Sequence, residues 1–296
     1  MRMWLFSAMS ALALAGAGFA ALVYWPIGAE PKLSSLEGDV QKGAYLARMS
    51  GCIACHSNTK GGGKPLAGGY EIPTNFGRFY SPNLTTDDEF GIGTWSIEDF
   101  SKAVRQGVSP NGEPYYPSFP YAFYAGFSDQ DIADLWAAFQ TVPAVAEPSK
   151  SHEMMPPFNW RAGLKLWRSL YFKQEAYTSE PTKSAAWNRG RYIVEAAAHC
   201  GACHTPRNLL GARQTELALS GSDQLPGGGS AAAITSEQLK QSGWTISSLK
   251  YALQTGLMPD GDVFGSSMGQ VIRDQTAFLS EQDREAIAIY LLEGQN

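Results

Sequence analysis

The chain has 296 residues, of which 44% are hydrophobic and 17% are charged, so it carries enough apolar material for packed cores and is not a disordered chain. At about 150 residues per domain, this length predicts two domains. The net charge is −5, with 28 acidic against 23 basic residues, which excludes the basic surplus expected of a nucleic-acid-binding protein.

The first 28 residues are predicted to form a membrane anchor. Arg2 is the only charged side chain before Glu30, and an apolar stretch runs from Met3 to Trp25. A spanning helix needs about 20 apolar residues, whereas the apolar core of a cleaved secretory signal has about 7–15. The stretch therefore predicts a transmembrane helix over residues 1–28, with a cleaved signal peptide as the alternative. In both cases the rest is exported, which predicts the bacterial inner membrane with the folded part facing the periplasm.

Four cysteines form two copies of the motif C-x-x-C-H, at residues 52–56 and 200–204. In this motif both thiols bond covalently to one haem, and the adjacent histidine becomes the proximal ligand of the iron. The alternatives are a zinc site, whose cysteine pairs usually lie about 15–20 residues apart, and a redox dithiol, which needs no histidine. Two covalently bound haem c groups are therefore predicted. Their expected attachment residues are Cys52, Cys55, Cys200 and Cys203, and their expected iron ligands are His56 and His204.

The surroundings of the two motifs repeat along the chain. Residues 43–46 (GAYL) and 190–193 (GRYI) precede them, and residues 95–97 (WSI) and 244–246 (WTI) follow. Ser128 and Ser280 each begin a capping-box pattern ahead of an amphipathic helix. No run of alternating strand residues appears, so the sequence predicts an all-α fold. The expected divisions are haem domains over 38–148 and 184–296, with a linker over 149–183.

The repeat also indicates a sixth iron ligand for the second haem. A haem iron held by His and Met is an electron-transfer centre with a raised potential. Met268 lies 24 residues after Trp244, whereas the same step from Trp95 reaches Phe119. Met268 is therefore the predicted sixth ligand of the second haem, ahead of Met258, which has no counterpart in the first half.

The first haem has no such methionine, and several hypotheses for its sixth position stay open. His152 in the linker is one candidate ligand, and Met154 or Met155 beside it are others. The iron is otherwise five-coordinate, or bound by a Tyr or a Lys. For His152 the competing interpretation is a solvated loop histidine.

Two further features of the sequence suggest contacts with other groups. Residues 159–173 are basic and aromatic in an otherwise acidic chain, which indicates interdomain packing or a surface for lipid headgroups or a partner. Arg207, Trp95 and Trp244 are candidates to neutralise or cover haem propionates.

With these motifs, the chain resembles the membrane-bound cytochrome c subunits of bacterial periplasmic alcohol and gluconate dehydrogenases, over nearly everything after residue 38. The segments that carry the resemblance are Pro65–Gly69, Tyr80–Thr85, Gly91–Ser96, Tyr116–Tyr121, His199–Arg207 and Phe264–Met268. The resemblance implies two tandem cytochrome c-type haem domains. It departs at two points, because the alcohol dehydrogenase cytochromes carry three haems and have methionine at the position of Phe119.

The resemblance implies an electron relay from a periplasmic dehydrogenase subunit to a quinone, a cytochrome or a terminal oxidase. This role is that of an electron-transfer subunit, and the sequence nominates no catalytic residues. The alternative is a catalytic, peroxidase-like diheme enzyme with an open first haem, for which Phe119 is the supporting residue. A diheme subunit of a terminal oxidase is a third hypothesis.

Overall fold

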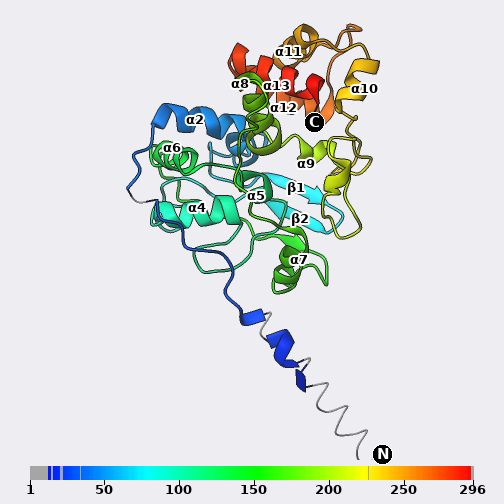
Figure 1. Cartoon of the computed structure of the whole chain (residues 1–296). Helices are drawn as coiled ribbons and strands as arrows, with labels where there is room; N and C mark the ends of the chain where they lie inside the picture. Colours follow the sequence, from blue (N-terminus) through cyan, green and yellow to red (C-terminus); the bar gives the residue numbers. More distant parts are fainter. Residues whose placement is uncertain (1–12, 15, 21–22, 34, 226, 295–296) are drawn as a thin grey trace, which may run out of the picture.

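The structure is a computed structural model, which describes residues 13–14, 16–20, 23–33, 35–225 and 227–294. It is mostly helical, and the helices around the two C-x-x-C-H motifs gather in two groups, one above the other in Figure 1. The helices of the first group are α2 (Val40–Met49), α3 (Cys52–Cys55), α4 (Ile97–Gln106), α5 (Tyr121–Tyr124) and α6 (Asp129–Phe139), with the short 3-10 turn η1 (Thr59–Gly61).

The second group repeats this order after a linker that contains α7 (Gly163–Tyr171). Its helices are α8 (Ala185–Tyr192), α9 (Gly201–His204), α10 (Ser236–Gln241), α11 (Ile246–Thr255), α12 (Ser266–Asp274) and α13 (Glu281–Glu293). Between them lie a π-helical turn η2 (Ile193–Ala197) and the 3-10 turns η3 (Thr215–Leu217) and η4 (Thr276–Phe278). The domain limits at 38, 148 and 184 stay predictions.

One close helix crossing builds each group. α2 packs across α6 in the first, and α8 packs across α13 in the second (Figure 1). At the crossings, a Cβ atom on Gly43 would lie 1.8 Å from the carbonyl oxygen of Asp134, and one on Gly190 would lie 1.9 Å from that of Ala286. Only glycine permits this approach of two backbones, so the repeated glycine is a packing requirement.

A small sheet corrects the all-α prediction. Strands β1 (Glu71–Thr74) and β2 (Gly77–Tyr80) form an antiparallel hairpin, and β3 (Glu153–Met154) from the linker pairs with the outer edge of β2. The hairpin turns at Gly77, whose φ of 131° is unfavourable for other residues. The strands are too short to show alternation, and the third is recruited from more than 70 residues away, so local pattern did not reveal them.

The predicted transmembrane helix over residues 1–28 is the second correction. Residues 1–12, 15 and 21–22 of that segment lie outside the described residues, and the rest has helical stretches only at 13–14, 16–20 and 23–24. In the part of the chain that the structure describes, no helix has the length and apolarity that a membrane crossing requires.

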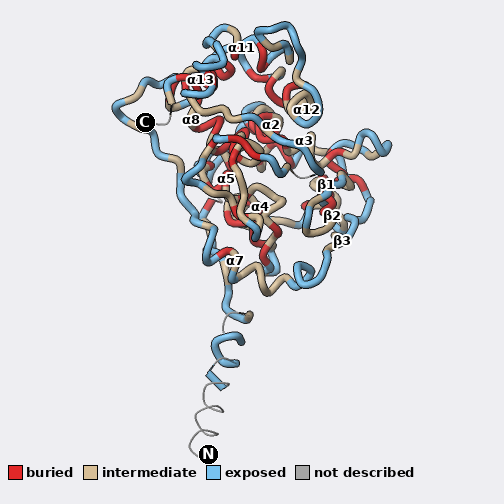
Figure 2. The backbone as a smooth tube through the Cα atoms, turned by 90° about the vertical axis from the view of Figure 1, so that its right-hand side faces the viewer, coloured by how far each residue is buried: buried red, intermediate tan, exposed pale blue. Residues whose placement is uncertain are grey.

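The two groups share one hydrophobic core. Buried segments concentrate where α2, α5, α8 and α13 meet, while the outer loops and α7 are more exposed (Figure 2). Phe127 after α5 and Tyr192 at the end of α8 belong to the same cluster, with ring centroids 6.3 Å apart. The relative position of the two haem motifs is therefore set by packing as well as by the linker.

A polar cluster stabilises the interface between the two groups of helices. The Asp283 carboxylate on α13 accepts two hydrogen bonds from Arg189, both 2.8 Å, and one from the Tyr45 hydroxyl at 2.7 Å. Tyr45 lies on α2, and its hydroxyl oxygen accepts from the Ser280 amide at 2.9 Å. Burial alone would raise the pKa of Asp283, but the hydrogen bonds from Arg189 and Tyr45 hold it below its ordinary value.

We expect Asp283→Asn to reduce the free energy of unfolding by about 2 kcal/mol at neutral pH, because it leaves the buried side of Arg189 without a charged acceptor. The depressed pKa means that this contribution is complete above the ordinary carboxyl pKa of about 4 and is lost as the pH falls through the lower folded value. Urea unfolding of the wild-type protein and of Asp283→Asn, from neutral pH down to acidic pH, tests this expectation. A difference between them that does not shrink at low pH would contradict the assignment.

Candidate haem sites

The first motif lies on a single helical turn. Cys52 and Cys55 are the ends of α3, and His56 directly follows them as its C-cap. The His56 Nδ1 atom lies 2.9 Å from the carbonyl oxygen of Pro82, which can only accept a hydrogen bond. Nδ1 therefore carries the proton, and the lone pair of Nε2 is left for a metal.

The second motif has the same arrangement. Cys203 and His204 lie on α9, with Cys200 immediately before it. The His204 Nδ1 atom lies 2.7 Å from the carbonyl oxygen of Ala232. Both histidines are thus fixed in the tautomer and orientation that a proximal iron ligand requires.

The electrostatics of both motifs keep their side chains neutral. Burial lowers the pKa of His56 to about 4, and it also lowers the pKa of His204, so neither ring is charged at neutral pH. Burial raises the pKa of Cys52 and Cys200 to about 12 and that of Cys55 to about 11. The four cysteines are half-buried, and none of them forms a disulfide. Neutral sulfurs beside an oriented imidazole fit a covalently attached haem, whose thioethers carry no charge.

The loops that hold the two histidines match bond for bond. The amides of Gly68 and Gly221 donate to the carbonyl oxygens of His56 and His204, at 2.8 and 2.9 Å. Two residues earlier, the Leu66 amide donates to the Ser57 hydroxyl and the Leu219 amide donates to the Thr205 hydroxyl. Both leucines have positive φ, 59° and 62°. A strained backbone at the same place in both loops marks it as a requirement of the site.

The structure also agrees with the register that relates Phe119 to Met268. A tight loop follows α4 and another follows α11. The Tyr115 amide donates to the Gly107 carbonyl at 2.8 Å, and the Phe264 amide donates to the Gly256 carbonyl at 2.9 Å. Four residues after these closing bonds lie Phe119 and Met268.

Within the second of these loops lies Met258, at the place that Ser109 takes in the first. The amides of these two residues close their turns on the carbonyls of Asp262 and Glu113, at 2.8 and 2.9 Å. Met258 thus belongs to a turn. Met268 is half-buried on α12 against the hydrophobic core. Ligation by Met268 stays a prediction, with its register now supported by backbone hydrogen bonds.

Phe119 sits in an aromatic cluster. Its ring centroid lies 5.9 Å from that of Tyr124, 6.0 Å from Tyr115 and 6.3 Å from Tyr121. A phenyl ring offers no lone pair, so this position supplies no iron ligand.

His152 lies on the edge of the small sheet. Its ring packs against Phe79 and Tyr116, with centroids 5.3 and 5.7 Å away, and its Nδ1 atom accepts a hydrogen bond from the Tyr80 amide at 3.2 Å. An accepting Nδ1 places the proton on Nε2, which is the opposite tautomer to that of the two motif histidines. Beside it, Met154 is half-buried in β3 and Met155 is 49% exposed.

Two arginines lie near the second motif, and the sequence had singled out only Arg207. Arg207 donates to the carbonyls of Gly211 and Ala202, and the Arg213 guanidinium lies 3.8 Å from the centre of the Phe123 ring in the other half. Burial, followed by repulsion from Arg207, lowers the pKa of Arg213 to about 10. No signal in the sequence could have paired Arg213 with Phe123, because the contact joins the two halves.

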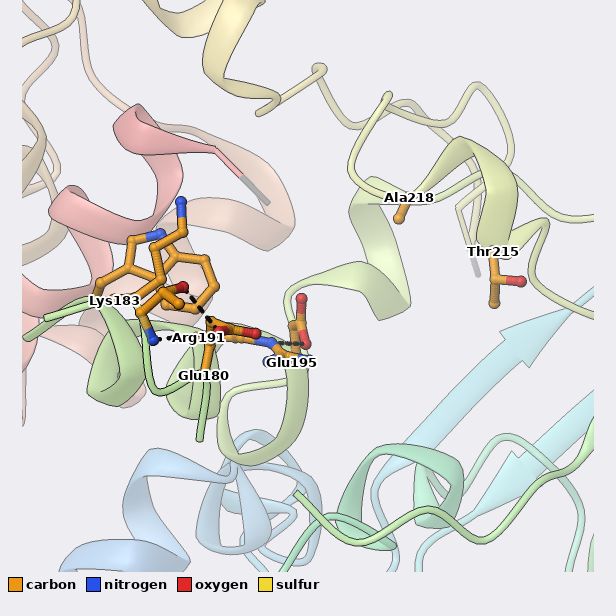
Figure 3. Close-up of a pocket in the computed structure, with 8 residues that line it drawn as sticks. Glu180, Lys183, Arg191, Glu195, Thr215 and Ala218 are labelled. Carbon is orange, nitrogen blue, oxygen red and sulfur yellow. Dashed lines mark hydrogen bonds and ion pairs between the residues drawn. The ribbon is translucent and has the colours of Figure 1, made fainter. Parts of the chain in front are cut away.

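One cavity lies apart from both motifs. It measures about 610 Å³ and separates α8 and the preceding loop from η3 (Figure 3). Arg191 and Glu195 form an ion pair of 3.0 Å on its wall. Its lining residues are Glu180, Thr182, Lys183, Trp187, Arg191, Glu195, Thr215 and Ala218. None of them belongs to a motif, so this groove does not hold the haems.

Known proteins share this arrangement. Residues 40–139 match the cytochrome c family. A diheme cytochrome c-type protein of Cereibacter sphaeroides is 37% identical over 270 residues, which cover 90% of this chain and 90% of that protein. The chain belongs to the diheme c-type cytochromes. Covalently bound haem c is its cofactor, and the resemblance inferred from the motifs is confirmed.

Other relatives of this diheme cytochrome serve dehydrogenases. The fructose dehydrogenase cytochrome subunit of Gluconobacter japonicus is 37% identical, and the gluconate 2-dehydrogenase cytochrome c subunit of Pantoea cypripedii is 38% identical, each over 85% of this chain. The chain spans 52% and 58% of the length of these two relatives. Its role is that of an electron-transfer cytochrome.

We expect Met268→Ala to lower the reduction potential of one haem and to leave the other unchanged, since a thioether ligand raises the potential of haem iron. A spectroelectrochemical titration of the purified cytochrome measures both potentials. The matched control is Met258→Ala, which alters the neighbouring turn and is expected to change neither. Two unchanged potentials in Met268→Ala would remove Met268 from the ligand set.

We expect His152→Ala to leave the absorption and EPR spectra of both haems unaltered, because the His152 ring is held by Tyr80 in the tautomer that does not ligate. A change of spin state confined to one haem in this variant would show that His152 binds the iron.

Proposed function

We propose that this diheme cytochrome accepts electrons from a periplasmic dehydrogenase and passes them to the respiratory chain. The observation that carries the proposal is the closeness of the two haem motifs. Tyr124 donates a hydrogen bond of 2.6 Å to the Ser50 carbonyl, two residues before Cys52, and its ring centroid lies 5.7 Å from that of His199, the residue before Cys200. Two haems attached there form a short relay.

The dehydrogenase partner is supported by the relatives. Three of them are named as cytochrome subunits of fructose, gluconate and alcohol dehydrogenases, at 35–38% identity. The chain spans about half the length of those subunits, and the substrate of its own dehydrogenase is left open by the proposal. A quinone, a cytochrome or a terminal oxidase is the proposed acceptor.

The proposed location is the periplasm. Arg2 followed by an apolar stretch is typical of an export segment, and the motif for covalent haem attachment suits an exported protein. A dehydrogenase that releases electrons on the same side of the membrane would then reach the cytochrome directly.

One observation favours a second function. Phe119 occupies the position that Met268 takes in the second half, so the first iron has an open face unless another residue closes it. An open iron binds small ligands and peroxide, which is the requirement of a peroxidase-like diheme enzyme.

Carbon monoxide tests whether the first iron has an open face. We expect the reduced protein to bind carbon monoxide at one haem per chain, and Phe119→Met to abolish that binding by supplying a thioether. Binding at neither haem would show that both irons are six-coordinate and would remove the peroxidase alternative. Binding that persists in Phe119→Met would show that residue 119 does not face the iron.

Isolation of the full chain from its host tests the relay itself. We expect a dehydrogenase catalytic subunit to accompany it, and the substrate of that subunit to reduce both haems. Haems that stay oxidised while hydrogen peroxide is turned over rapidly would overturn the relay and favour the enzyme.

A further inference from the structure

The residues immediately before the two motifs share an unusual backbone conformation. Gly51 precedes Cys52 with φ 72°, and His199 precedes Cys200 with φ 44°. Glycine adopts this left-handed region freely, whereas a histidine is strained there and stays only when its surroundings hold it. The strained residue thus lies beside a haem attachment site and only in the second half.

What holds His199 is the other half of the molecule. Its half-buried ring stacks on Tyr124, with centroids 5.7 Å apart and planes 26° apart, and meets the edge of Phe123 at 5.9 Å. Both aromatic residues lie on α5. The Arg213 guanidinium lies 3.8 Å from the centre of the Phe123 ring, so two residues of the second half, His199 and Arg213, contact α5.

Tyr124 is fixed in turn to the first motif. Its hydroxyl donates a hydrogen bond of 2.6 Å to the carbonyl oxygen of Ser50, two residues before Cys52. Phe127 stacks near its ring, with centroids 5.1 Å apart and planes 19° apart. One side chain therefore contacts the residues that precede both haem attachment sites.

Close packing around this contact leaves it little freedom. A Cβ atom on Gly126 would lie 3.1 Å from the Cβ of Ala196 on η2, and one on Gly201 would lie 3.4 Å from the Phe123 ring. Small residues at these points let α5 approach the second motif. The contact between Tyr124 and His199 is thus a rigid spacer between two sites that must stay at a fixed separation.

We propose that Tyr124 and His199 are positioning residues that set the separation and orientation of the two haems, and thereby the rate of electron exchange between them. The proposal rests on the relay function for its purpose. Electron exchange between haems falls steeply with distance, so a spacer anchored beside both attachment sites controls it. The strain at His199 is the cost of placing a ring at that point.

The experiment uses the full-length, haem-loaded protein and a chemical reductant, so it needs no dehydrogenase. Pulsed reduction followed by absorption spectroscopy gives the exchange rate between the haems. Dipolar broadening in the EPR spectrum of the oxidised protein reports their separation. Potentials and the melting temperature are measured on each variant.

His199→Gly gives the second half the residue that the first half has, removing ring and strain together. Tyr124→Leu removes the stacked ring. We expect both to slow the exchange roughly tenfold, as small displacements of reacting groups do, and to weaken the dipolar broadening while the potentials stay constant. Tyr124→Phe keeps the ring and loses only the bond to Ser50, so its effect is smaller. Should the larger changes prevent haem loading, Tyr124→Phe and His199→Asn, which tolerates the left-handed region, carry the test.

Tyr177→Phe is the matched control. Tyr177 also packs between the halves and donates a hydrogen bond of 2.6 Å to a backbone carbonyl, that of Asn188, but it does not contact His199 or Ser50. We expect it to change stability without changing exchange. Unchanged exchange and EPR broadening in all the Tyr124 and His199 variants would overturn the proposal, as would equal slowing in Tyr177→Phe. If the variants alter the exchange rate but no dehydrogenase substrate reduces the haems, the spacer proposal stands and the proposed relay function is wrong.

Discussion

The hydrogen bond from each motif histidine to a backbone carbonyl is the constraint on which both sites depend. Pro82 and Ala232 supply that carbonyl from 26 and 28 residues further along the chain. Each bond selects the tautomer of the ring and also fixes the path of the intervening loop. The positive φ of Leu66 and Leu219 follows from this path, because the loop must turn back sharply to bring its carbonyl under the histidine.

The two halves share this backbone arrangement but carry different side chains at two pairs of equivalent positions. The backbone closes the same loop ahead of Phe119 and Met268, yet only one of these residues has a lone pair to offer. The backbone takes the same left-handed turn at Gly51 and His199, yet only one carries a ring. The two halves keep the same backbone arrangement around the haem motifs, and they differ at the predicted position of the sixth ligand and in what lies between the two sites.

Features set by short-range sequence could be predicted, and those set by contacts between distant segments could not. The helix beginning after Ser128 forms as expected, with the reciprocal capping box to Asp131. At Ser280 the same pattern only half applies. The Ser280 hydroxyl accepts from the Asp283 amide, but the Asp283 carboxylate binds Arg189 and Tyr45 across the interface. The third strand and the contact at His199 could not be predicted for the same reason, since their partners come from distant parts of the chain.

Under the proposed ligation and the proposed spacer, the rate and the direction of electron flow depend on different parts of the molecule. A thioether raises the potential of haem iron, so the proposed ligation gives the second haem the higher potential and favours electron flow from the first half to the second. That bias depends on Phe119, which precedes α5, and on Met268, which lies on α12. The proposed spacer depends on α5 and on the residues before each motif. Phe119 packs against Tyr124 of the spacer, so its substitution can alter both properties, whereas Met268 lies on another helix and its substitution can change the driving force alone.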